Sequence, residues 1–188
     1  FDFSTDKQLP FMTVNVNGLV SSVLWLNHDT FLIVAYTSNK DKSQKLALIN
    51  LLSSYVMPLP IDPCLSGKVN VMEIERRNGF LLFGTKSGKA AIIEMVTVND
   101  FKLKWMYDFK RTEVTAVAAL NNLFAFGTLD GDVLLASLQN EIGTPNGIIK
   151  IKLLKVQFPV ISIIIELDKI IVAGNANYFE VWKATECL

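Results

Sequence analysis

The sequence contains very little of the chemistry from which catalytic centres are built. Among 188 residues there is one histidine, His28, beside Asp29, and there are two cysteines, Cys64 and Cys187. Nucleophilic catalysis needs a nucleophile with a base beside it, and a metal site needs clustered His, Cys, Asp or Glu side chains. Because the sequence has neither pattern, we predict no enzyme activity, no metal and no cofactor. We interpret His28 as an exposed turn residue.

The two cysteines are far apart in the sequence and do not have the spacing of metal ligands. Small secreted domains usually carry more cysteines, paired in disulfides, whereas isolated free thiols are typical of reducing compartments. Cys64 and Cys187 are therefore interpreted as unpaired thiols. This favours an intracellular protein, in the cytoplasm or the nucleus.

An excess of charge and a long hydrophobic run are also missing. Eighteen basic residues balance eighteen acidic ones, so electrostatic capture of nucleic acid or of an anionic membrane is not indicated. The longest apolar run, around residues 158–167, is interrupted by Pro159, Ser162 and Glu166. It is much shorter than the roughly 20 residues of a transmembrane helix. Direct nucleic-acid binding and membrane insertion are therefore not expected.

The sequence is rich in apolar residues, which make up 51% of the chain and follow a fourfold repeat. Each copy has an apolar strand, a short gap, a second apolar strand ending in a small residue, a turn and a third strand. Aligned on Ala35, Gly84, Gly127 and Gly174, the copies are 49, 43 and 47 residues apart. This period is typical of β-propeller blades. We predict an all-β fold, a β-propeller of four-stranded antiparallel blades.

The turns and small residues define the four blades. Ser87-Gly88 and Asp130-Gly131 stand between apolar runs and predict hairpins, since glycine accepts the positive φ of tight turns. The small residue that ends each second strand predicts close approach of neighbouring blades. The blades are expected near residues 20–59, 69–107, 114–154 and 160–188, and the segment 11–16 is expected to be an additional strand.

Four blades are fewer than the about six to eight expected for blades of this width. We therefore expect part of a larger ring, completed by further blades or by another segment. The sequence begins with Phe1 and not with methionine, which also favours a fragment of a longer protein. The strand at 11–16 is placed to complete the last blade, which has only three predicted strands. An open array would expose two apolar faces, so it is not expected to be stable alone.

The third and fourth copies carry a recognisable signature. The segment 127–137 has Asp130 in its turn, and the fourth copy ends in Val181-Trp182-Lys183. From about residue 11 to residue 188 the pattern resembles the Trp-Asp (WD) repeat propeller family, with Lys183 in place of the signature aspartate. The family's Gly-His pair is absent and His28 is misplaced for it, so the family's hydrogen-bond network is not expected. The resemblance implies degenerate repeats held by apolar packing, with Asp130 accepting backbone hydrogen bonds in its turn.

The resemblance implies a noncatalytic scaffold that binds other proteins within a multiprotein complex. Two alternatives stay open: a subunit of a nucleic-acid-associated assembly, for transcription or repair, and a propeller enzyme with a site in the central channel. The basic pairs Arg76-Arg77 and Lys110-Arg111 belong to loop classes that open on opposite faces of a propeller. They are therefore not expected to form one patch.

The connection from Pro58 to Leu65 is the strongest candidate for a partner contact. Its three prolines, at positions 58, 60 and 63, favour an extended chain. That chain carries the apolar residues Leu59, Ile61 and Leu65. The strip either packs under a blade or offers a partner an ordered apolar surface, and we take Leu59, Ile61 and Leu65 as candidate partner-binding residues. A second insertion, residues 138–149, is expected to be a flexible loop or the remnant of a disordered segment left out of the sequence.

Overall fold

The computed structural model describes residues 12–26, 30–60, 67–97, 100–139 and 148–184. These residues form fifteen β-strands in four antiparallel sheets, which confirms the predicted all-β fold. The strands are β1 (Gly18–Trp25), β2 (Phe31–Ser38), β3 (Gln44–Asn50), β4 (Tyr55–Leu59), β5 (Val69–Glu75), β6 (Phe80–Thr85), β7 (Lys89–Thr97), β8 (Asp100–Asp108), β9 (Val114–Leu120), β10 (Leu123–Thr128), β11 (Asp132–Gln139), β12 (Ile148–Lys155), β13 (Val160–Glu166), β14 (Lys169–Gly174) and β15 (Phe179–Lys183).

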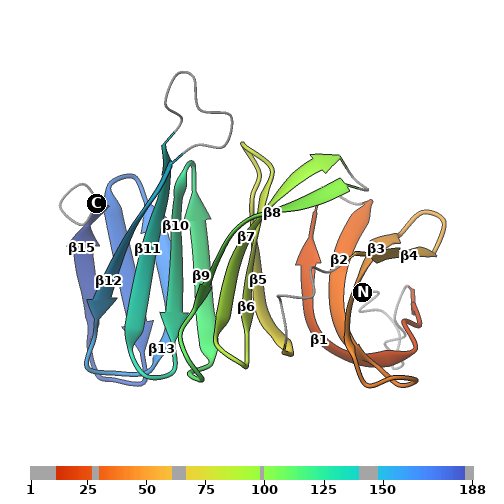
Figure 1. Ribbon diagram of the computed structural model, residues 1–188, viewed down its shortest axis with the longest axis horizontal. Helices are drawn as coiled ribbons and strands as arrows, with labels where there is room; N and C mark the ends of the chain where they lie inside the picture. The colour runs from red at the N-terminus through yellow and green to blue at the C-terminus, as the bar shows by residue number, and fades with distance from the viewer. Residues whose placement is uncertain (1–11, 27–29, 61–66, 98–99, 140–147, 185–188) are drawn as a thin grey trace, which may run out of the picture.

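Each sheet is built from strands that are consecutive in the chain. The first three sheets, β1–β4, β5–β8 and β9–β12, have four strands each, and the last sheet, β13–β15, has three. Figure 1 shows the four sheets side by side in chain order, with the first and the last at opposite ends of the row. The innermost strands are neighbours, since β5 contacts β1 and β9, and β9 also contacts β13.

Apolar side chains fill the space between successive sheets. Ile33 and Leu48 of the first sheet pack with Leu81 and Phe83 of the second in one buried cluster. The other two interfaces repeat this arrangement with Leu82, Ile92, Phe124 and Phe126, and then with Ala125, Leu135, Ile170 and Val172. Burying apolar surface stabilises a fold by roughly 25 cal/mol per Å². The contacts between sheets therefore form the core of the molecule.

Each innermost strand has a bulge at the same place, which fixes how the copies correspond. The ladder register shifts between Val20 and Ser22, between Val69 and Val71, next to Val114, and between Val160 and Ser162. A bulge inserts one unpaired residue and bends the strand. Val20, Val69, Val114 and Val160 are therefore structural equivalents.

The bulges correct the alignment of the fourth copy by one residue. Ala35, Gly84 and Gly127 each pair with the residue two positions after the bulge valine of their sheet. In the last sheet that residue is Ser162, and it pairs with Ala173. Gly174 instead pairs with Val160. The sequence alignment on Gly174 was wrong because two small residues are adjacent there, and a one-residue slip exchanges the two faces of a strand.

The strand predicted over residues 11–16 is not formed in the part that the structure describes, residues 12–16. Val14 and Val16 nevertheless pack onto the first sheet, against Val34 and Ile49. A strand needs a neighbour with which to exchange backbone hydrogen bonds. The segment is thus extended along an apolar surface but has no partner strand within the described chain, and it lies at the end of the row opposite the last sheet.

Replacing Gly127 with valine should destabilise the protein. A Cβ atom at this position would overlap Val160 Cγ1 and lie 2.9 Å from Ile163 Cδ1, both in the next sheet. Overpacking of this kind costs about 1–3 kcal/mol, and denaturant unfolding measures it. Lys152→Val, on exposed β12, is the control and should change the free energy of unfolding by less than about 0.5 kcal/mol. Equal stability of the two variants would contradict close blade packing.

Candidate interaction surfaces

The predicted apolar strip is only partly within the described chain. Leu59 is the last residue of β4, pairs with Leu46, and is 7% exposed within the cluster that joins the first two sheets. Ile61 and Leu65 lie outside the described residues. Leu59 therefore follows the alternative in which the strip packs under a blade, while a partner contact by Ile61 and Leu65 stays a prediction.

The residues with the most reactive side chains also fall outside the described ranges: His28, Cys64 and Cys187. Among the residues that the structure describes, no group of three or more His, Cys, Asp or Glu side chains is placed to hold a metal ion. In the same residues no helix is long and apolar enough to cross a bilayer.

The turn that contains Arg76 and Arg77 connects neighbouring blades. Arg77 Nη1 donates to Asn121 Oδ1 at 3.3 Å, and Asn78 Nδ2 donates to Asn122 Oδ1 at 3.0 Å. Asn121 and Asn122 form the equivalent turn, between β9 and β10, of the next sheet. Arg77 and Asn78 thus join two neighbouring turns in this structure.

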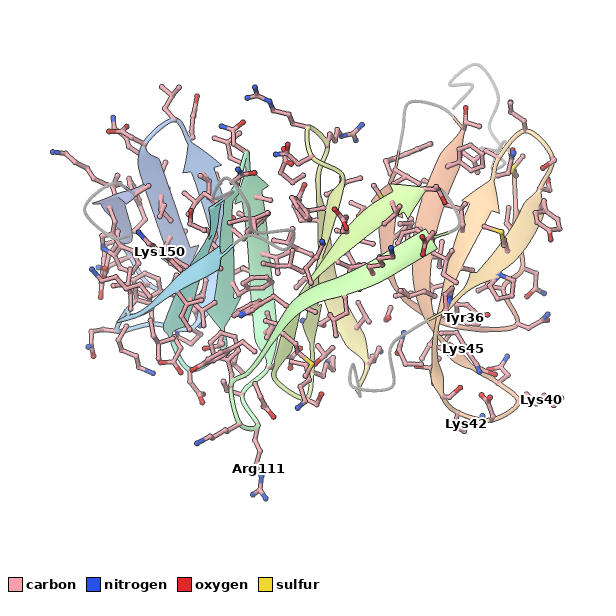
Figure 2. All side chains as sticks on the ribbon, turned by 45° about the horizontal axis from the view of Figure 1, so that its top comes forward. Tyr36, Lys40, Lys42, Lys45, Arg111 and Lys150 are labelled. Carbon is pink, nitrogen blue, oxygen red and sulfur yellow. The ribbon has the colours of Figure 1, made fainter. Side chains whose placement is uncertain are left out.

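Lys110 and Arg111 lie at the other edge of the sheets, between β8 and β9, as the alternation of antiparallel strands requires. Figure 2 shows Arg111 projecting away from the sheets, with Lys40 and Lys42 in the β2–β3 turn well separated from it. The two predicted basic pairs therefore do not form one patch.

Carboxylates neutralise much of the basic charge along this edge. Lys89 pairs with Asp108 at 2.6 Å, Lys155 with Asp132 at 2.9 Å, and Lys86 with Glu113 at 3.5 Å. The hydrogen bond from Lys89, followed by that from the Lys110 backbone N–H, lowers the pKa of Asp108 below its ordinary value. Phosphate binding relies on unpaired Lys and Arg side chains, and these pairs reduce their number.

Two buried threonines organise the hairpins, and sequence reasoning missed them. Thr128 Oγ1 accepts the Asp132 N–H at 3.0 Å, and Thr85 Oγ1 accepts the Lys89 N–H at 2.9 Å. Both threonines are fully buried. Asp130 is exposed and makes no hydrogen bond in the described structure, so the backbone-binding role predicted for it belongs to Thr128. The recurrence of Gly-Thr in the second and third copies was the available signal.

The first sheet has an apolar side that no other sheet covers, which we call the leading face. Val14 and Val16 cover its part around Val34 and Ile49, whereas large apolar side chains of β1 remain exposed. This face carries Val20, Val23 and Trp25 of β1, which pair with Tyr36, Val34 and Leu32 of β2. Val20 is 45% exposed, whereas its equivalent Val69 is 3% exposed and the other two equivalents are fully buried. The difference arises because a sheet precedes every other copy. The leading face thus has the composition of an interface between blades.

The last sheet has an uncovered apolar side of its own, which we call the trailing face. Ile164, Ile171 and Val181 are aligned across its three strands, next to Ala173 and Phe179. Ile164, Val181 and Phe179 are exposed. The opposite side of the same sheet, with Ile163 and Val172, is buried against β9–β12. Both ends of the array therefore present large apolar side chains to solvent.

The residue in each bulge also differs between the interior faces and the trailing face. In the second sheet Asn70 Nδ2 donates to the backbone oxygen of Val114 at 3.2 Å, and in the third sheet the Thr115 hydroxyl donates to the backbone oxygen of Val160. These bonds connect one blade to the next. The fourth sheet has the exposed isoleucine Ile161 in this position. Its trailing face is thus more apolar at this point than the two interior faces.

Comparison with solved structures identifies the fold formed by these four sheets. The chain is similar to the β-propeller domain of Cps50 (Swd1) from Myceliophteria thermophila, with a TM-score of 0.66 and 11% identity over 88% of this chain and 54% of that one. The chain has the fold of β-propeller blades. It is also similar to Sqt1 from Saccharomyces cerevisiae, with a TM-score of 0.69 and 11% identity over 90% of this chain and 48% of that one.

A third similar structure has about the length of this chain. The computationally designed protein Ika4 matches with a TM-score of 0.67 and 11% identity, over 94% of this chain and 99% of its own. The chain thus spans about half of Swd1 and Sqt1 and nearly all of Ika4. No protein-family model and no curated protein matches the sequence. At this identity the comparisons establish the propeller fold.

Replacing Thr128 with valine should destabilise the propeller without changing its shape. The substitution conserves volume but removes the only atom that accepts the Asp132 N–H in this buried hairpin. An unsatisfied buried donor costs about 1–3 kcal/mol, and thermal and denaturant unfolding report the loss. Ser53→Ala, which removes a hydroxyl at an exposed position, is the control and should have little effect. Equal unfolding free energies would mean that the hydroxyl is not structurally important.

Proposed function

We propose that the chain is a noncatalytic interaction scaffold, a degenerate member of the Trp-Asp repeat propellers that binds other proteins inside the cell, within a multiprotein complex. The observation that supports this proposal is that both the apolar and the polar side chains described above serve to hold the blades together. Apolar residues fill the space between blades, while the polar interactions described above bind turns, bulges and neighbouring strands to one another. What such a frame offers to other molecules is its loops and its uncovered faces.

The charge distribution favours protein partners over nucleic acid. Lys89, Lys155 and Lys86 are paired with carboxylates, and Arg77 is bonded to a neighbouring turn. A dedicated nucleic-acid reader concentrates unpaired cations on one surface. Membership of a nucleic-acid-associated assembly would then rest on a partner that binds the nucleic acid, as the neutral net charge also suggests.

The candidate contact within this scaffold is the connection between β4 and β5. Leu59, directly before this connection, is buried in the core between the first two blades. Ile61 and Leu65 follow in the same proline-rich segment. A segment held by an anchored end and by prolines loses less conformational entropy on docking than a free loop does. We propose that Ile61 and Leu65 contact a protein partner.

Changing Ile61 and Leu65 together to serine should release a specific partner and leave thermal stability almost unchanged. Affinity purification of the tagged protein from its own cells, with quantification of every co-purified protein, measures the loss. Leu52→Ser is the matched control, since Leu52 is a highly exposed leucine in another turn, and it should retain all partners. Leu59→Ser should instead lower stability by about 2–5 kcal/mol because it empties part of the core.

Lower stability of the Ile61 and Leu65 variant with no selective loss of a partner would mean that the strip is packed under a blade. Turnover of a small molecule by the purified wild-type protein would restore the enzyme alternative. Retention of nucleic acid by the purified chain at physiological salt would restore direct nucleic-acid binding.

A further inference from the structure

The leading and trailing faces have matching shapes. At each internal interface a valine from the bulge of one blade meets the small residue of the preceding blade: Val114 lies against Gly84, and Val160 against Gly127. At the ends the same pair is divided. Val20 is exposed on the leading face, and Ala173 occupies the small-residue position on the trailing face. The protruding valine (knob) and the small-residue position (hole) of one further blade interface are thus both present, and neither is filled by the other.

The N-terminal segment has the position of an outer strand. Val14 and Val16 precede Val20 by the same spacings at which Leu154 and Val156 precede Val160. Leu154 lies near the end of β12, the outer strand of the third blade, Val156 follows that strand directly, and both pack in the cluster between the third and fourth blades. Val14 and Val16 pack in the same way against the first blade. Residues 12–16 therefore lie where a preceding blade would have its outer strand.

Within the described chain, the last blade has no outer strand of that kind. Its sheet ends at β15, and in the described chain no strand pairs with the outer edge of β15. An exposed edge of this kind readily accepts another strand. Residues 13–16 have the required alternation, since Val14 and Val16 pack on the first sheet while Thr13 and Asn15 are exposed. The chain thus has both a strand without a partner edge and a sheet edge without a partner strand, and the two lie at opposite ends of the array (Figure 1).

We propose that two copies of the chain close one eight-bladed ring. The leading face of each copy packs on the trailing face of the other, and residues 12–16 of each copy add the fourth strand to the last blade of the other. The third blade sets the register: Leu154 pairs with Val133, and the equivalent of Val133 is Phe179. Val14 is thus placed opposite Phe179 of the second copy, and Thr13 opposite Glu180.

A second copy fits these faces better than solvent or a polar cap does. Terminal repeats that face water carry polar outer surfaces, whereas the trailing face has isoleucine in the bulge and exposed Ile164, Phe179 and Val181. Four blades span about half of Swd1 and Sqt1, and two such halves give eight blades, within the usual range for propellers. The match to Ika4 covers 94% of this chain and 99% of that one. The pairing does not depend on the proposed scaffold function.

Mass measurement of the purified chain tests the pairing directly. Size-exclusion chromatography with light scattering should give twice the 21.0 kDa of one chain. Val23→Glu on the leading face and Ile164→Lys on the trailing face should each weaken dimerisation by roughly 100-fold or more, because each buries an unpaired charge twice per ring. The control is Leu153→Lys on exposed β12. Leu153 is 52% exposed and Ile164 53%, and the control should stay dimeric.

Mixing the two face variants distinguishes this ring from other dimers. A mixed pair of Val23→Glu and Ile164→Lys has one wild-type interface and one in which the opposite charges are on facing surfaces. It should therefore dimerise more tightly than either variant alone. In a dimer built by two like faces, only one of the two variants would dissociate. Circular dichroism of each variant verifies that the sheets remain folded, and a substitution that fails is replaced by Val181→Lys or Val20→Glu.

A disulfide between copies tests the added strand. In a background with Cys64 and Cys187 changed to serine, Thr13→Cys in one protein and Glu180→Cys in another should form a covalent heterodimer under mild oxidation, since cross-strand neighbours are within disulfide reach. Thr13→Cys mixed with Lys152→Cys is the control and should remain uncoupled.

Three results would overturn the proposal. One is a wild-type protein that is monomeric, or that forms an open series of larger oligomers, at concentrations well above micromolar. Another is a dimer that only one class of face variant dissociates. The third is a dimer in which residues 13 and 180 do not couple, because the fourth strand would then come from elsewhere. A complex in which other blades cover both faces would appear as a 21.0 kDa monomer in isolation, which is the first of these results.

Discussion

The structure depends on the close approach of each blade to the one before it. A valine at the bulge of each later blade is buried, and Val114 and Val160 lie where a Cβ atom on Gly84 or Gly127 would be. This contact brings the sheets near enough for Leu82, Phe124 and their neighbours to exclude water. Since dispersion forces fall off steeply with distance, a small increase in the spacing would weaken every contact in the interface.

Apolar packing of this strength holds the sheets together without the hydrogen-bond network that is typical of Trp-Asp repeats. The hairpins are organised by the hydroxyls of Thr85 and Thr128, which are local to each turn. Bonds between blades run from bulge residues such as Asn70 to the backbone of the next sheet. A side-chain bond to backbone is largely insensitive to the sequence of the partner strand, so the repeats are able to diverge while their geometry stays the same.

The sequence was sufficient for the fold because apolar periodicity and Gly-containing turns are local signals. It failed where the answer depends on a neighbour. Ala173 and Gly174 are both small, and only the bulge register shows which one meets the next blade. The strand at 11–16 was predicted from its alternation, yet strand formation requires a partner edge. For Leu59 two alternatives stayed open, packing under a blade or contact with a partner, because burial against a second blade cannot be read from one segment.

The interaction surfaces follow from the same contact. A propeller blade has two different faces, one with a knob and one with a hole, so any array that does not close leaves one of each. Such ends are complementary to each other and not to themselves, and heterologous contacts of this type either close into a ring or continue as a filament. The angle between successive blades decides between these outcomes. The proposed pairing of two copies corresponds to closure of the ring after the second copy.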